Sequence, residues 1–145
     1  MRTRPQPTTG VGIFVRAVIN GNELEDILDI DEFFRSPGTA GLQPLFTCDC
    51  GNFGCGGYYV YVDTTPSAWV LRNRYHPLEK QLVTKFEYQV AWSQVRDAAR
   101  RIAGTLGEVH AARPEAQIFS GVYGQDLTGQ IADYSKLVEN LNDRG

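Results

Sequence analysis

The residues of this chain best suited to chemistry are its three cysteines, which lie close together at Cys48, Cys50 and Cys55. Thiolates are favoured protein ligands of zinc, and a structural zinc site takes four ligands in a tetrahedron. Four glycines fall within the same stretch, TCDCGNFGCGG. Glycine lets a backbone turn tightly enough to aim several side chains at one point. Residues 47–57 are therefore a candidate loop for holding a structural zinc ion.

The loop itself lacks an obvious fourth zinc ligand. His76, in the stretch RNRYHP, is the best candidate, because a strand hairpin could bring residues 70–76 back beside the loop. His110, a water molecule and the carboxylate of Asp49 are the alternatives. The predicted metal ligands are therefore Cys48, Cys50, Cys55 and His76.

Two other uses of the cysteines stay open. Small buried thiols commonly pack as apolar groups, and the same glycines are what a tight turn with positive φ requires. A thiol-dependent enzyme would need a thiolate beside a histidine base, a pair that Cys55 with His76 or His110 would supply. Such pairings also arise by chance, so we rank catalysis third and assign no catalytic residue.

The spacing Cys-x-Cys-Gly-x-x-x-Cys between Cys48 and Cys55 resembles the post-SET zinc motif of histone lysine methyltransferases. The resemblance is local, and nothing in the chain looks like the SET catalytic domain or its Asn-His signature. What the resemblance implies is a metal-holding loop, without methyltransferase activity.

A broader resemblance, over residues 13–72, is to a group of small bacterial proteins of uncharacterised function. They combine an early strand followed by Asn-Gly, a cysteine-glycine loop, a valine-rich strand and a tryptophan. The matching features here are VING, LFTCDCGNFGCGG, YYVYV and Trp69. This resemblance implies a shared architecture and no particular activity.

An acidic segment, residues 23–32, holds six of the 17 acidic residues and no basic residue, which leaves 11 acids against 14 basic residues elsewhere. That asymmetry would suit an inhibitor or immunity-type protein that binds a basic partner such as a nuclease. The simpler alternative, which we favour, is a solvated edge strand and turn whose charges prevent edge pairing. The residues predicted to bind such a partner are Glu23, Glu25, Asp26 and Asp29.

Composition limits the other classes of function. A formal net charge of −3 gives no indication of nucleic-acid binding. Residues 72–101 hold seven basic and three acidic residues among aromatic ones, but Tyr88 and Trp92 at a helix start are more typical of a core or a dimer interface. We therefore expect a protein partner, with a homodimer as one option, and consider nucleic acid a weaker candidate.

Length and cysteine count indicate a small cytoplasmic domain. A chain of 145 residues suits one domain, and no apolar run approaches the roughly 20 residues that cross a bilayer. An odd number of cysteines argues against a disulfide framework. The start, MRTRPQPTTG, is charged and proline-rich, so residues 1–10 are expected to be a disordered tail before a single domain at residues 11–145.

Periodicity predicts strands first and helices later. Alternating apolar residues predict strands at residues 13–19, 45–48, 57–64 and 68–73, with a hairpin turn at Asn20-Gly21 and a short helical turn at residues 31–35. Residues 36–44, rich in Gly and Pro, are predicted to be a loop. Together these predict a meander of about three strands around the cysteines.

Two helices are predicted in the second half. The first carries the apolar stripe Ala91, Val95, Ala98, Ile102 and Leu106, with Gly107 as its C-cap. The second begins near Asp126 as N-cap and carries the stripe Leu127, Ile131, Tyr134, Val138 and Leu141. Residues 118–123 are predicted to add one short strand between them. The predicted fold class is α+β, an antiparallel sheet with two C-terminal helices on one face.

Overall fold

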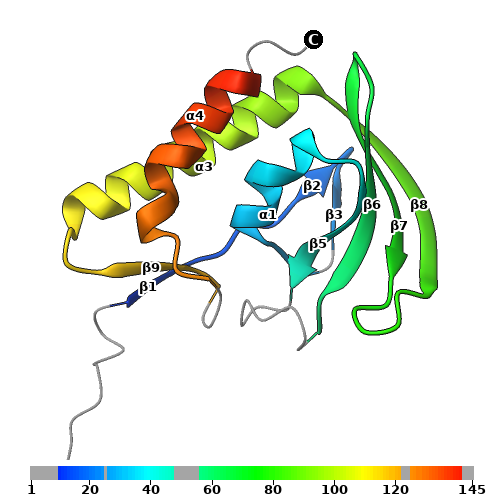
Figure 1. The fold of residues 1–145 in the computed structure, drawn as a ribbon, viewed down its shortest axis with the longest axis horizontal. Helices are drawn as coiled ribbons and strands as arrows, with labels where there is room; N and C mark the ends of the chain where they lie inside the picture. Colours follow the sequence, from blue (N-terminus) through cyan, green and yellow to red (C-terminus); the bar gives the residue numbers. More distant parts are fainter. Residues whose placement is uncertain (1–9, 25, 48–55, 122–124, 142–145) are drawn as a thin grey trace, which may run out of the picture.

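An antiparallel sheet of five strands dominates the computed structural model, which describes residues 10–24, 26–47, 56–121 and 125–141 (Figure 1). Its strands lie in the order β4-β5-β6-β7-β8, so each is hydrogen-bonded to its neighbour in the sequence. The strands are β4 (Ile27–Leu28), β5 (Gly41–Thr47), β6 (Tyr58–Thr64), β7 (Ala68–Tyr75) and β8 (Leu82–Ala91). The predicted meander is confirmed.

The meander is longer than the sequence interpretation allowed. It continues into β8, where half-buried Phe86, Tyr88 and Val90 alternate with exposed polar residues. The predicted loop at residues 36–44 is wrong in its second half, because β5 begins at Gly41. Pro44 has no N–H to give the sheet, and the β5–β6 register shifts at this point, between Gln43 and Phe46.

The N-terminal segment does not form the single strand predicted at residues 13–19. It divides into β1 (Gly10–Ile13), which pairs in parallel with β9 (Gln117–Ser120), and β2 (Val18–Ile19), which pairs with β3 (Asn22–Glu23). Between the two strands, the carbonyl of Val15 accepts the N–H of Leu28 at 2.7 Å. The predicted hairpin turn is confirmed, since both Asn20 and Gly21 have positive φ, 53° and 80°.

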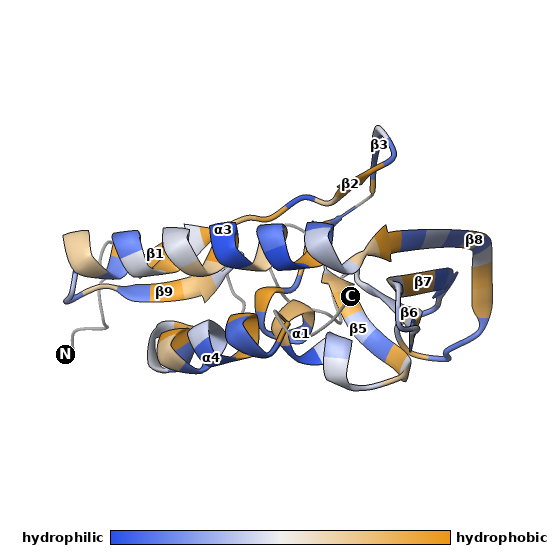
Figure 2. Cartoon of the chain, turned by 90° about the horizontal axis from the view of Figure 1, so that it is seen from above, coloured by the Kyte–Doolittle hydropathy of each residue, from blue (hydrophilic) through white to orange (hydrophobic). Residues whose placement is uncertain are grey.

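Helices cover one face of the sheet, as predicted. They are α1 (Ile30–Arg35), α3 (Trp92–Ala112) and α4 (Ile131–Leu141), with short 3₁₀ turns η2 (Ser36–Gly38) and η3 (Thr128–Gln130). In Figure 2, α3 and α4 run side by side and the β2–β3 hairpin projects away from them. The α+β fold class is confirmed.

The structure corrects both predicted helix ends. Asp126 accepts hydrogen bonds from the N–H and hydroxyl of Thr128, but the cap position of η3 is Leu127 and α4 begins only at Ile131. Gly107 is not a C-cap, because α3 continues through it to Ala112. Buried Leu106 and half-buried Val109 on either side keep the helix packed against the protein, which outweighs the weak helix propensity of glycine.

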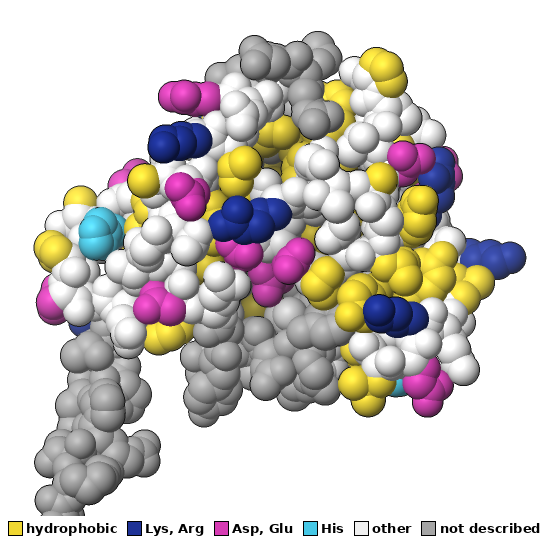
Figure 3. Space-filling model, in the orientation of Figure 1, with side chains coloured by type: hydrophobic (Ala, Val, Ile, Leu, Met, Phe, Trp, Pro, Cys, Tyr) yellow, Lys and Arg dark blue, Asp and Glu magenta, His cyan; other side chains and the backbone are white. Residues whose placement is uncertain are grey.

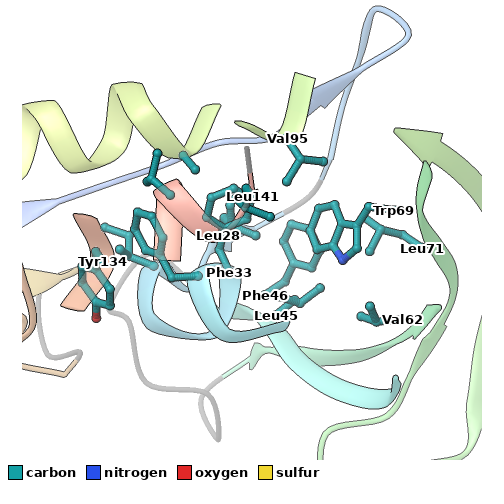
Figure 4. Close-up of a cluster of buried hydrophobic side chains, with 14 of the residues drawn as sticks. Leu28, Phe33, Leu45, Phe46, Val62, Trp69, Leu71, Val95, Tyr134 and Leu141 are labelled. Atoms are coloured by element: carbon teal, nitrogen blue, oxygen red, sulfur yellow. The ribbon is translucent and has the colours of Figure 1, made fainter. Parts of the chain in front are cut away.

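One buried cluster joins the sheet to the helices (Figure 4). Trp69 and Leu71 of β7 lie opposite Val95 of α3, while Tyr134 of α4 packs beside α1. The predicted disordered tail falls on residues outside the described range, except Gly10, which opens β1. Within the described ranges, no helix is long and apolar enough to span a bilayer.

Candidate binding groove

The three cysteines predicted to hold zinc, Cys48, Cys50 and Cys55, lie outside the described residues. Their attachment points are described. Phe46 of β5 pairs with Tyr58 of β6, and the two rings stack with centroids 4.9 Å apart. The cysteine loop therefore joins two adjacent antiparallel strands, as predicted, and the metal it was predicted to hold stays a prediction.

His76 lies at the same end of the sheet as the cysteine loop, because the preceding residue, Tyr75, pairs with Tyr59 near the start of β6. Its Nδ1 accepts the backbone N–H groups of Leu78 and Glu79 at 3.1 and 3.2 Å. A neutral imidazole that accepts at Nδ1 carries its proton on Nε2. Zinc binding through Nε2 would move this proton to Nδ1, which could then no longer accept the two N–H groups of the turn. The ligand role of His76 stays a prediction.

His110, the alternative ligand or base, lies in the last turn of α3 rather than in a loop. That end of α3 is on the opposite side of the molecule from β6 and β7 (Figure 1). Its buried Nδ1 has no hydrogen-bond partner in the part of the chain that the structure describes. The structure does not bring His110 near the strands that carry the cysteine loop.

The acidic segment has two different environments. Glu23 is exposed on the β2–β3 hairpin, whereas half-buried Asp29 caps α1 by accepting the N–H of Glu32 at 3.0 Å. Burial raises the pKa of the Asp29 carboxyl above its ordinary value, and nearby Asp31 adds to the effect. Asp26 is half-buried and Glu25 lies outside the described residues. Partner binding by these residues stays a prediction.

A polar cluster that the sequence did not reveal closes the contact between α1 and α4. The Tyr134 hydroxyl donates to Asp31 at 2.7 Å, and Arg35 Nε lies 3.0 and 3.1 Å from the two oxygens of the same carboxylate. Burial, and then the bond to Asp31, raises the pKa of Tyr134 far above its ordinary value. The Tyr134 ring also stacks on Phe34 with centroids 4.3 Å apart. The Asp31–Arg35 spacing, one helical turn, was the only sequence signal for this cluster.

On the other side of α3 the packing is open. A groove of about 760 Å³ lies between the N-terminal segment 13–20 and α3. Its floor comes from the sheet and α1, and includes Phe33, Trp69 and Leu71, which point toward one another in Figure 4. The other apolar lining residues are Ile13, Phe14, Val15, Ala17, Val18, Ile19, Leu28, Phe46, Val90, Val95, Ala98 and Ile102.

Polar side chains also line the groove, and they carry an excess of positive charge. The charged members are Arg16, Asp97 and Arg101, and the uncharged ones are Asn20, Gln94 and Thr105. Arg101 is exposed on α3 and makes no ion pair with any of the described residues. Arg16 is engaged by a neighbour. The groove thus combines an apolar floor with at least one arginine available to an anion.

Trp69 gives the floor of the groove an unusual feature. The side chain is only 4% exposed, and its Nε1 has no hydrogen-bond partner among the described residues. The ring meets Phe33 edge-on, with centroids 5.7 Å apart and planes at 75°. A buried indole usually finds an acceptor, so this floor is held by ring packing rather than by hydrogen bonding.

The sequence interpretation missed this groove. Its residues come from eight separate elements, namely β1, β2, β4, α1, β5, β7, β8 and α3, and none of them is unusual in type or spacing. Trp69 was noticed only as part of the bacterial resemblance. No family model, no curated protein and no solved structure matches this chain. The resemblance to small bacterial proteins stays a prediction, and the groove must be interpreted from its own chemistry.

Proposed function

We propose that this chain is a non-catalytic binding domain whose groove takes a small apolar molecule with an anionic end. The observation that carries the proposal is the groove of about 760 Å³ between residues 13–20 and α3. Pockets that bind small molecules are typically about 300–1,000 Å³, mainly apolar, with a few placed polar groups. The size and lining of this groove fit that description.

The chemistry of the ligand follows from the two parts of the groove. A charged group could not rest on the floor of Trp69, Leu71 and Phe33 without losing its hydration. Arg101 lies where such a group would still be hydrated, and a guanidinium pairs well with a carboxylate. An unbranched carboxylate such as decanoate is the simplest molecule that satisfies both parts.

Calorimetric titration with decanoate, below its micelle concentration, tests the proposal. We expect saturable binding of decanoate and at least about tenfold weaker binding of decylamine, because the amine would face Arg101 instead of pairing with it. Tryptophan fluorescence should change with the same midpoint, and the change should be lost in Trp69→Phe. Equal affinity for the two ligands, or no binding of either, would contradict the proposal.

Two neighbouring arginines provide a matched control. Arg101 lines the groove, whereas Arg100 pairs with Asp97 at 3.8 Å and lies on the flank of α3 that faces α4. Arg101→Gln should weaken decanoate binding about tenfold, and Arg100→Gln should leave it within about twofold. A similar loss in both variants would mean that general positive charge, rather than this groove, attracts the ligand.

The cysteine loop remains a second proposal at a different place, a structural zinc clip held by Cys48, Cys50 and Cys55. It is supported by the residue types and by the pairing of Phe46 with Tyr58, which holds the two strands that flank the cysteine segment side by side. Elemental analysis of fresh protein should find one zinc per chain, with the thiols reactive only after chelation. Three freely titrating thiols and no zinc would rule out the clip. A cytoplasmic location, which reduced thiols would suit, stays a prediction with it.

A further inference from the structure

The face of the main sheet that points away from the helices carries a group of tyrosines (Figure 1). In β6, Val60 and Val62 are buried in the core, so Tyr59 and Tyr61, which alternate with them, lie on the opposite face. Tyr59 pairs directly with Tyr75 of β7, and side chains directly opposite each other in an antiparallel pair share a face. Tyr61 is 38% exposed, and the other two tyrosines are half-buried. The outward face therefore presents aromatic rings to the solvent.

A bulge in β7 places Arg72 on the same outward face. Tyr61 pairs with Arg72, and the residue before Tyr61 pairs with Arg74. Asn73, which has a φ of 65°, is therefore the extra residue of β7. The side-chain contacts agree with this register, because the Arg74 guanidinium lies over the ring of core residue Tyr58, 4.3 Å from its centroid. Arg74 thus faces the core, and Arg72 lies beside Tyr61 on the outside.

Two carboxylates hold Arg72 in place. Its Nε lies 2.9 Å from Glu87 of β8, and its Nη1 lies 3.3 Å from Asp63 of β6. Arg72 pairs with Tyr61 on one side and with Glu87 on the other, so these three side chains form a row across three strands. The side chains of Arg72, Asp63 and Glu87 remain 38%, 41% and 48% exposed. A guanidinium and a carboxylate each form more hydrogen bonds than these ion pairs use, so the row offers fixed donors and acceptors beside an aromatic ring.

The charges that these contacts place on the outward face balance. Besides Arg72 and its two carboxylates, the face carries Lys80, whose Nζ lies 5.1 Å from the centroid of the Tyr59 ring. Two cations therefore meet two anions. Figure 3 likewise shows apolar, basic and acidic side chains interspersed on the side of the molecule formed by β6 to β8. A single-stranded nucleic acid binds where aromatic rings lie in a positively charged groove. A balanced face favours a ligand without net charge.

We propose that this face binds a neutral oligosaccharide, with one sugar ring stacked on Tyr61 and its hydroxyl groups bonded to Arg72 and the two carboxylates. A pyranose with equatorial hydroxyls has flat faces of weakly positive C–H groups, which suit the negative face of a phenol ring. Hydroxyl groups both donate and accept, so neighbouring hydroxyls satisfy a guanidinium and a carboxylate together. This site lies on the opposite face of the sheet from the apolar groove, whose floor includes Trp69 and Leu71, and does not depend on it.

The positions of the tyrosines select among neutral sugars. Tyr59 and Tyr75 lie one row further along the sheet than Tyr61, and two residues of a strand span about 6.6 Å. A second sugar of a short chain would reach that row if the chain ran straight along β6. Glucose units joined by β-1,4 bonds form a straight chain, whereas α-1,4 bonds make the chain curl. Cellotetraose is therefore the probe, and maltotetraose is its matched control.

Calorimetric titration of the full chain tests the site. Cellotetraose should bind saturably, and maltotetraose should bind at least about tenfold more weakly. Tyr61→Ala should weaken cellotetraose binding at least about tenfold, whereas Tyr61→Phe keeps the ring and should change it less than about threefold. The proposal would be overturned if cellotetraose did not bind at about 10 mM, if Tyr61→Ala left its affinity unchanged, or if the two sugars bound equally. Tighter binding of a thymidine oligonucleotide than of cellotetraose would also overturn it, in favour of nucleic acid.

Two further measurements do not depend on removing the ring. Saturation-transfer NMR of the wild-type chain should mark the C–H protons on one face of a sugar ring more strongly than those on the other, because only one face stacks on Tyr61. Arg72→Lys keeps the charge but loses the forked donor, so it should weaken cellotetraose binding at least about fivefold while the circular dichroism stays that of the wild type. Equal marking of both faces would contradict stacking, and an unchanged affinity of a folded Arg72→Lys variant would contradict recognition of the hydroxyl groups by Arg72.

Discussion

The two flanks of α3 pack in opposite ways. On one flank, α4 and α1 close against each other through the stacked rings of Phe34 and Tyr134 and the bonds from Tyr134 and Arg35 to Asp31. On the other flank, the segment 13–20 leaves a groove of about 760 Å³ over apolar side chains. Both flanks are rich in apolar residues, so hydrophobicity alone does not decide which one closes.

The difference lies in the size and chemistry of the side chains that meet. On the closed flank, a large ring fills the space and its hydroxyl finds a buried carboxylate, which fixes the geometry of both helices. On the open flank, α3 presents Ala98 toward the groove, and the facing segment supplies Val15 and Ala17 together with Phe14, which stays 47% exposed. The side chains on the open flank therefore do not fill the space between α3 and the facing segment, and the ligand that we propose would fill it.

The largest effect is expected from opening the closed flank. Tyr134→Ala removes a fully buried ring and its bond to Asp31, and should lower the free energy of unfolding by about 3–5 kcal/mol. Tyr134→Phe keeps the stacked ring and should lose only about 1–2 kcal/mol. Urea denaturation measures both. If the two losses were equal, the hydroxyl rather than the ring would be what closes this flank.

A smaller loss is expected from disturbing the anchor of the open flank. A Cβ added at Gly12 of β1 would lie 2.8 Å from the carbonyl oxygen of Gly121, so Gly12→Ala should cost about 1–3 kcal/mol by forcing β1 away from β9. Gly38→Ala is the matched control, because nothing lies within 4 Å of its added Cβ. A Gly12→Ala variant as stable as the control would show that β1 can shift without consequence. The Gly12→Ala substitution should also weaken decanoate binding, because β1 leads into the wall of the groove.

A modest gain is expected within α3 itself, between the two flanks. Gly104 lies in the helix interior with nothing within 4 Å of an added Cβ. Gly104→Ala should therefore raise the free energy of unfolding by about 0.5–1 kcal/mol through helix propensity. Decanoate affinity should not change, because Gly104 faces α4 rather than the groove. A loss of stability would instead mean that the α3–α4 contact needs the space that glycine leaves at position 104.

The smallest effect is a pH dependence on the closed flank. Burial raises the pKa of Asp29 above its ordinary 3.8, so the folded state holds this proton more tightly than the unfolded state does. Stability from this group is complete below pH 3.8 and is lost as pH rises through the higher folded pKa. Asp29→Asn keeps an acceptor for the Glu32 N–H, so it should flatten this part of the pH profile while preserving the cap. Parallel profiles for wild type and variant, from thermal melts between pH 3 and 6, would contradict the expectation.

Local patterns were enough to predict much of the fold. Asn20-Gly21 specified its hairpin, Asp126 lies within two residues of the start of the last helical segment, and the alternation in YYVYV specified β6. These features depend on neighbours in the sequence. Gly107 misled because packing at Leu106 and Val109, which the sequence does not display, carries the helix past a residue that often ends one.

The site was beyond local reasoning for a related physical reason. Trp69, Val15 and Ala98 meet only because the curved sheet, the N-terminal segment and α3 come together in three dimensions. Asp31 and Tyr134, 103 positions apart, likewise share a bond that no short-range pattern indicates. The cysteines drew attention because their types and spacing are rare, yet rarity in the sequence did not point to the groove.

The parallel pairing of β1 with β9 has a consequence for how the chain is made. Gly10 pairs with Gln117, so β1 leaves the ribosome about a hundred residues before the strand with which it pairs. Contacts between such distant positions form slowly, because a long stretch of chain must first be brought to order. The wall of the groove is therefore completed only after β9 has been made, and nascent chains that end before β9 should form the five-stranded sheet but lack a complete groove wall.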